Sequence, residues 1–208
     1  MLYILIFFLE VILLYILSRK LKNKLLYSIL KVTKRKRLSF YIFAFIFLPG
    51  TYFHELCHGL AAKVLFVRMG KLNLKPILVG NKLKLGSVSI VKSDLIRRTI
   101  IGIAPFFLGI STILFLTYFA VYSNLPHSSL IILIIGYIIF QIANSLFLST
   151  SDLKYSWKGL PFFLIFAITL YRLGVKINLD LIKISNLYLL LPIAIDFILL
   201  VLLRALRL

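Results

Sequence analysis

Long apolar blocks separated by short basic segments limit what this chain can fold into more than any other feature. The blocks lie at residues 2–17, 40–66, 99–122, 130–148, 160–170 and 187–203. Hydrophobic residues make up 62% of the 208 residues and the mean hydropathy is +1.05, well above the range of globular domains. The pattern predicts an all-α polytopic, multi-pass protein of the cell membrane, with about six transmembrane helices in a single membrane domain over residues 1–208.

The chain is strongly basic, with 25 Lys and Arg against 6 Asp and Glu and a formal net charge of +19. In a soluble protein this charge would indicate nucleic acid as a partner. Here the basic residues flank apolar blocks, so the predicted partner is the lipid bilayer and not nucleic acid. Residues 18–37 carry nine Lys or Arg and no acid, with Leu and Ile at helical spacing, which predicts a basic amphipathic helix at the membrane surface.

A metal-binding motif is found within the second apolar block, as His54-Glu55-Leu56-Cys57-His58. Residues four apart lie on one face of a helix, so the two imidazoles can reach the same ion. Glu55 neighbours that face and can take a proton from a metal-bound water. Ionisable groups are costly in a lipid-compatible segment, which makes them candidates for function. The alternative is a pair of histidines whose hydrogen bonds are satisfied by neighbouring groups.

The third ligand can be sought by elimination, because a catalytic zinc usually has three protein ligands. No Glu follows Glu55, and the extended motif that continues with Gly and His has Ala61 and Val64 at those positions. Cys57 is the single cysteine, which excludes a zinc site built from paired cysteines. The remaining candidates are Glu10, Asp94, His127, Asp152, Asp180 and Asp196.

Asp152 is the favoured candidate, because polar residues precede it at the end of a predicted span and indicate a hydrated cavity. These residues are Asn144, Ser145, Ser149, Thr150 and Ser151. Two of the other candidates lie within predicted spans. We expect Glu10 to be protonated or paired with another span, and Asp196 to be paired with Lys or Arg.

Residues 69–92 interrupt the apolar pattern. Short runs alternate between Lys and Leu, a β-branched run follows at 88–91, and Gly80-Asn81 and Gly86 supply turns. We predict a small membrane-associated β-hairpin segment of one or two hairpins, whose edge an extended peptide could join. Just before the metal motif, Pro49-Gly50 predicts a kink or a new start in the helix.

Taken together, these features resemble the site-2 protease family of intramembrane zinc metalloproteases. That family has an HExxH helix in the membrane, then a β segment, then a span with a Gly-x-Pro-like stretch, and finally an Asn and an Asp eight residues apart. Gly102-Ile103-Ala104-Pro105 and the pair Asn144 and Asp152 stand at the corresponding places. Two prolines of the family motif are replaced here by Phe147 and Thr150, and the Gly after the Asp by Leu153.

The resemblance covers about residues 40–153 and divides the chain into three parts. Residues 1–37 would be an N-terminal span with the basic segment, 38–153 the metalloprotease core, and 154–208 C-terminal spans. It implies one Zn²⁺ per chain, held by His54, His58 and Asp152. Glu55 would activate a zinc-bound water, and Asn144 would hydrogen-bond the oxyanion or position the substrate.

The function that the resemblance implies is hydrolysis of a peptide bond in a transmembrane or membrane-bound protein or peptide. The first alternative is a membrane scaffold or binding protein whose metal site is structural or vestigial. An ion carrier and a different membrane metallohydrolase are further alternatives. Neither the orientation nor the oligomeric state follows from the sequence, since six spans would leave 12 basic residues on one side of the membrane and 13 on the other.

Overall fold

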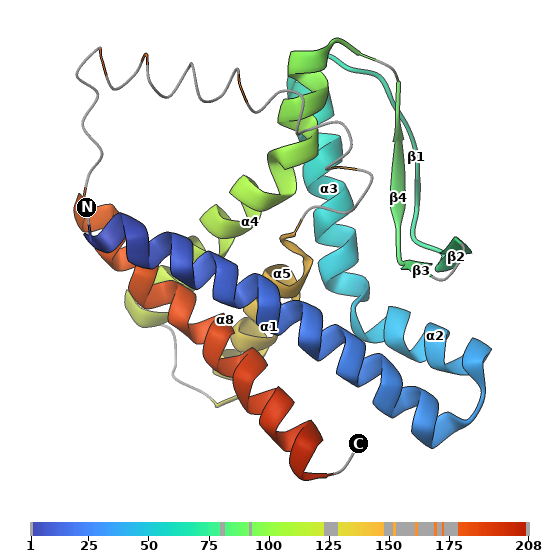
Figure 1. Ribbon diagram of the computed structural model, residues 1–208. Coiled ribbons are helices and arrows are strands. Elements are labelled where there is room, and N and C mark those ends of the chain that lie inside the picture. Colours follow the sequence, from blue (N-terminus) through green and yellow to red (C-terminus); the bar gives the residue numbers. More distant parts are fainter. Residues whose placement is uncertain are drawn as a thin grey trace.

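The structure is a computed structural model in which long helices cross one another and a β segment lies to one side (Figure 1). It describes residues 2–79, 82–91, 93–122, 129–147, 152, 161, 169, 172 and 179–206. The helices are α1 (Leu2–Thr33), α2 (Lys36–Ile46), α3 (Leu48–Val64), α4 (Leu95–Tyr122), α5 (Ser129–Ser145) and α8 (Leu179–Ala205).

The first helix is longer than the sequence suggested. We expected a span at 2–17 followed by a separate surface helix over 18–37, but α1 continues through the basic segment to Thr33. Residues 18–33 contain no Gly or Pro and are rich in Lys and Leu, which favour helix, so nothing in the sequence ends α1 at Leu17. Lys34, in the left-handed region with φ of 54°, separates α1 from α2.

The predicted kink before the metal motif is confirmed. Helices α2 and α3 meet at Phe47 and are bent by 64°. The bend leaves backbone groups without hydrogen-bond partners inside the helix. The side chain of Gln141 from α5 supplies these missing partners. Its Nε2 donates to Ile46 O at 2.7 Å, and its Oε1 accepts from Gly50 N at 3.3 Å. A broken helix between apolar segments is tolerated when a neighbouring helix satisfies the freed groups in this way.

The predicted β-hairpin segment is also confirmed. Strand β1 (Met69–Asn73) pairs antiparallel with β4 (Ser87–Ile90), and β2 (Ile77–Val79) pairs antiparallel with β3 (Lys82–Lys84). In Figure 1 the long pair runs beside α3 and the short pair lies above α2. The segment therefore returns along the helix that carries the HExxH motif.

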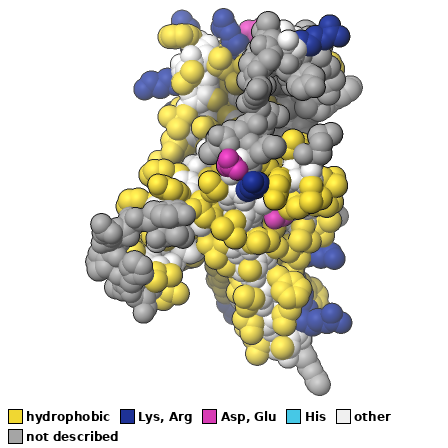
Figure 2. Space-filling view, turned by 90° about the vertical axis from the view of Figure 1, so that its left-hand side faces the viewer, with side chains coloured by type: hydrophobic (Ala, Val, Ile, Leu, Met, Phe, Trp, Pro, Cys, Tyr) yellow, Lys and Arg dark blue, Asp and Glu magenta, His cyan; other side chains and the backbone are white. Residues whose placement is uncertain are grey.

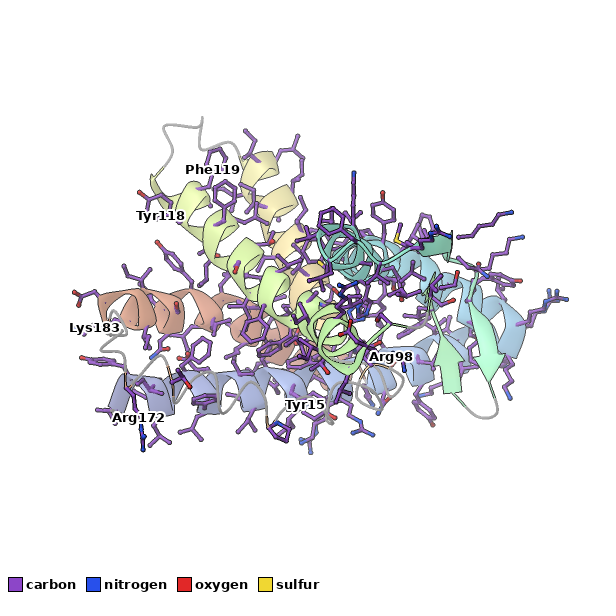
Figure 3. The ribbon with its side chains drawn as sticks, turned by 90° about the horizontal axis from the view of Figure 1, so that it is seen from above. Tyr15, Arg98, Tyr118, Phe119, Arg172 and Lys183 are labelled. Carbon is purple, nitrogen blue, oxygen red and sulfur yellow. The ribbon has the colours of Figure 1, made fainter. Side chains whose placement is uncertain are left out.

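Four helices share the main core. Helices α1, α4, α5 and α8 contribute Leu14, Ile113, Ile139 and Ile193 to one buried cluster. Helices α1 and α8 run side by side, as the view from above shows, and Lys183 near the start of α8 lies beside the N-terminal end of α1 (Figure 3). This packing brings residues from both ends of the chain together beside α5.

Large hydrophobic side chains cover much of the outer surface. They make up most of the described part of the face in Figure 2, whereas Lys and Arg gather mainly at the top and lower right of that view. Phe8, Phe115 and Phe197, from three different helices, are each more than half exposed. A surface of this kind is compatible with a lipid environment.

The predicted number of membrane spans is not confirmed. Among the described residues, three helical segments are long and apolar enough to cross a membrane: Leu2–Thr33, Leu95–Ala120 and Ile182–Ala205. The bent pair of α2 and α3 makes four if it forms one broken span, and the apolar part of α5 is shorter. The count of six is therefore not confirmed, and the predicted span at 160–170 lies almost wholly outside the described residues.

Candidate metal centre

Three side chains from distant parts of the sequence form what we call the histidine cluster: His54, His58 and Asp152. The Nε2 atoms of the two histidines are 3.2 Å apart. Asp152 places Oδ2 3.4 Å from His54 Nε2 and Oδ1 3.5 Å from His58 Nε2. Because one ligand atom of each residue lies within 4.8 Å of the others, the cluster can hold a metal ion.

The two histidines lie one turn apart on α3, as their spacing predicted. Their ring centres are 4.8 Å apart and the ring planes are nearly perpendicular, at 83°. The exposed fractions of the side chains are 11% for His54, 6% for His58 and 15% for Asp152. The cluster is thus largely shielded, with its small remaining exposure greatest at the carboxylate.

Each imidazole has its second nitrogen fixed by a backbone carbonyl. His54 Nδ1 lies 2.6 Å from the oxygen of Ser145, the last residue of α5, and His58 Nδ1 lies 2.7 Å from the oxygen of Ile101 in α4. A carbonyl oxygen only accepts, so these hydrogen bonds assign the proton of each ring to Nδ1. Both Nε2 atoms then carry lone pairs, which is the tautomer that binds a metal through Nε2.

With these tautomers, every atom that meets in the histidine cluster is an acceptor. Two imidazole lone pairs and a carboxylate lie 3.2 to 3.5 Å from one another and repel unless positive charge lies between them. A proton on one imidazole or a metal ion would supply that charge. Two His and one Asp also leave a fourth position of a tetrahedral ion open.

Glu55 follows His54 on α3 and is half-buried beside the β segment. The turn before β4 packs against this part of the helix. A Cβ atom added to Gly86 would lie 2.7 Å from Thr51 Cγ2 and 3.3 Å from Glu55 Cγ. Any residue larger than glycine would force this contact apart, so Gly86 allows the β segment to cover α3 next to Glu55.

Asn144 belongs to a second group, the Lys22 cluster, which consists of Lys22, Asn144 and Asp196. Asn144 is buried on α5, and its Nδ2 donates to Phe140 O at 3.1 Å and to Asp196 Oδ1 at 2.8 Å. Lys22 Nζ from α1 donates to the backbone oxygen of Asn144 at 2.7 Å. Since both amide hydrogens of Asn144 have acceptors here, its contact with an oxyanion or substrate stays a prediction.

The other candidates for the third ligand have different surroundings. Asp94 and Asp180 each form an ion pair with a basic residue three positions later. Asp196 belongs to the Lys22 cluster. Its electrostatic interaction with Lys22 fits the pairing with a basic residue that the sequence predicted. Glu10 is buried, and its Oε2 has no hydrogen-bond partner among the described residues. His127 lies outside the described residues.

Sequence reasoning missed the backbone groups that orient the site. The carbonyls of Ser145 and Ile101 cannot be read from residue type, because every residue has one. Two indirect signals were present: Ser145 ends an apolar helix, and Pro105 follows Ile101 by four residues. The roles of Lys22 and Gln141 had no local signal, since their partners are about 100 residues away in the sequence.

Comparison of the chain with protein-family models, with curated proteins and with solved structures finds no match. Function is therefore inferred from the geometry of the histidine cluster and from the residues around it.

Proposed function

We propose that the protein is an intramembrane zinc metalloprotease, which hydrolyses a peptide bond in a transmembrane or membrane-bound substrate. One observation carries the proposal: two imidazoles and a carboxylate from distant parts of the sequence bring one ligand atom each within 4.8 Å of the others, next to a Glu at the HExxH position. The resemblance to site-2 proteases supports the same function.

Zinc is the ion that this ligand set fits best. Ca²⁺ and Mg²⁺ prefer sites made of oxygen atoms, whereas imidazole suits Zn²⁺ and other late transition metals. His54, His58 and Asp152 would hold one zinc per chain and leave one position open to water or substrate. The hydrogen bonds from Nδ1 to backbone carbonyls support this choice, because metal-binding imidazoles usually donate their other N–H in this way.

The chain's own residues account for the proton transfers of the proposed reaction. A zinc ion bound at the cluster would supply Lewis-acid chemistry, which activates water and polarises the scissile carbonyl. Glu55 accepts the proton of the attacking water and passes it to the leaving amine. The Ser145 and Ile101 carbonyls keep both rings in the required tautomer. A contact of Asn144 with the oxyanion would require its amide to leave Asp196.

The substrate that we propose is a transmembrane segment that unwinds locally. A peptide bond inside a helix is shielded, because its N–H and C=O groups are already hydrogen-bonded within the helix. The β segment packs beside Glu55 and has backbone groups at its edge, with which an unwound strand could pair.

Replacing the proposed base tests the function. The Glu55→Gln variant is expected to bind one zinc per chain as the wild type does, but its cleavage rate should fall about 10²- to 10⁴-fold, the usual contribution of a general base. Cleavage can be measured by reconstituting the protein with a library of single-span membrane proteins and identifying new chain ends by mass spectrometry. Glu10→Gln, the same change at the other Glu of the chain, is the matched control and should cleave normally.

A metal site with a structural role in a membrane scaffold is the second candidate. The low exposure of the three ligand side chains, at most 15%, favours it. Such a site would hold zinc with all four positions taken by protein atoms. A wild-type cleavage rate in Glu55→Gln, together with a closed four-ligand site in X-ray absorption spectra, would favour the scaffold over the protease.

A further inference from the structure

The hydrogen bond of His58 goes to an unusual acceptor. Ile101 lies within α4, where a carbonyl normally accepts the N–H of the residue four positions later. That residue is Pro105, which has no N–H. The Ile101 oxygen therefore has no helical N–H from position 105, and instead lies 2.7 Å from His58 Nδ1.

We propose that Pro105 is a positioning residue of the metal centre: its missing N–H leaves the Ile101 carbonyl free to orient the His58 ring. The inference rests on the proposed function only in that it needs the histidine cluster to bind zinc. Pro105 is fully buried inside α4 and acts on the cluster through Ile101 and His58.

His54 also donates to a backbone oxygen that lacks a partner within its helix, but for a different reason. His54 donates to the oxygen of Ser145, the last residue of α5, and the carbonyls in the last turn of a helix have no N–H partner within that helix. Both imidazoles thus use carbonyls that lack their helical donor, one at a helix end and one four residues before a proline. A carbonyl without a competing donor gives the imidazole a stronger and better directed hydrogen bond.

An N–H at position 105 would weaken this arrangement. It would compete for the Ile101 oxygen and draw it along the helix axis, away from His58. The His58 ring would be held less firmly in the tautomer and direction that leave Nε2 for the metal. Loss of such an orienting partner typically weakens metal binding about 10- to 100-fold.

The test compares two buried helix prolines. In Pro105→Ala, zinc affinity measured by chelator competition on the metal-free protein should fall roughly 10-fold, while the melting temperature stays equal or rises because Ala favours helix. Pro192→Ala in α8 is the matched control, since Pro192 is also fully buried within a helix and no member of the histidine cluster comes from α8. Its zinc affinity should stay within about two-fold of the wild type.

A backbone ester separates the missing N–H from the proline ring. Lactic acid in place of Pro105 has the side chain of alanine but no N–H, so zinc affinity should return to the wild-type value. This variant decides the question even where Pro105→Ala fails to fold. If the ester variant binds zinc much more weakly than the wild type, the loss comes from removing the proline ring and not from an added N–H. That result would overturn the inference.

Two further outcomes would also overturn it: unchanged zinc affinity in Pro105→Ala, or an equal loss in Pro105→Ala and Pro192→Ala. Failure of the proposed function is distinguishable from these results. If the wild type binds no zinc, the metal centre itself fails, whereas a zinc-binding wild type with an equally good Pro105→Ala variant removes only the role of Pro105.

Discussion

The histidine cluster and the Lys22 cluster are both buried polar groups between apolar helices, yet their chemistry differs. In the histidine cluster, two imidazole nitrogens and a carboxylate lie 3.2 to 3.5 Å from one another, and with both rings protonated at Nδ1 these atoms repel. In the Lys22 cluster, an ammonium group donates to a carbonyl and an amide donates to a carboxylate. The second cluster carries its own positive charge, and the first needs one from outside.

This difference separates a site that binds a ligand from one that joins helices. Lys22, Asn144 and Asp196 come from α1, α5 and α8, so their hydrogen bonds connect three helices. Asn144 Oδ1 and Asp196 Oδ2 have no hydrogen-bond partner within the described residues, but Lys22 offsets the charge of Asp196. Burial and polarity are shared by both clusters, and the balance of donors and acceptors distinguishes them.

The largest stability effect is expected from breaking the Lys22 cluster. Asp196→Leu would leave the charge of Lys22 without its partner and should lower the free energy of unfolding by about 3 to 5 kcal/mol, as measured by chemical denaturation in micelles. Zinc content should stay at the wild-type level, because Asp196 belongs to the other cluster. The double variant Lys22→Met with Asp196→Leu removes both charges and should recover most of the loss.

Two results would contradict this distinction between the histidine cluster and the Lys22 cluster. A loss of zinc in Asp196→Leu under conditions where the protein is folded would mean that the two clusters act as one. A double variant no more stable than Asp196→Leu would mean that the charges do not compensate each other.

A smaller loss of stability is expected when the neutral side chain of Gln141, at the bend between α2 and α3, is replaced. Gln141→Leu removes the side chain that bonds to Ile46 O and Gly50 N, which leaves buried backbone groups unsatisfied. The free energy of unfolding should fall by about 2 kcal/mol in the same denaturation experiment. Gln141→Glu is the control, because it keeps an acceptor for Gly50 N but loses the donor to Ile46 O. If each hydrogen bond contributes separately, this variant should retain part of the stability that Gln141→Leu loses.

Local patterns predicted the parts of the site that depend on local geometry. The spacing of His54 and His58 predicted that both rings lie on one helix face, and Pro49-Gly50 predicted the bend. Turn residues and alternation predicted the β segment. Asp152 was reached by elimination and by the polar residues before it, and the structure places it beside the two rings.

The rest depends on tertiary contacts that no local pattern encodes. Lys22 looked like a surface lysine of an amphipathic helix, but the packing of α1 against the end of α5 directs it to Asn144 O. The acceptors of the two Nδ1 atoms are backbone oxygens, whose availability depends on where α5 ends and on a proline in α4. The predicted count of six spans is also not confirmed, because apolar length alone does not show which blocks continue as one helix.

The metal content of the purified protein tests the central claim most directly. Elemental analysis of the wild type should find one zinc per chain, and X-ray absorption should show imidazole nitrogens at about 2.0 to 2.1 Å. Asp152→Ala should lose most of the metal, because it removes the single carboxylate of the histidine cluster. A wild type without zinc, with a proton between the histidines instead, would contradict the account, as would an Asp152→Ala variant that binds zinc as tightly as the wild type.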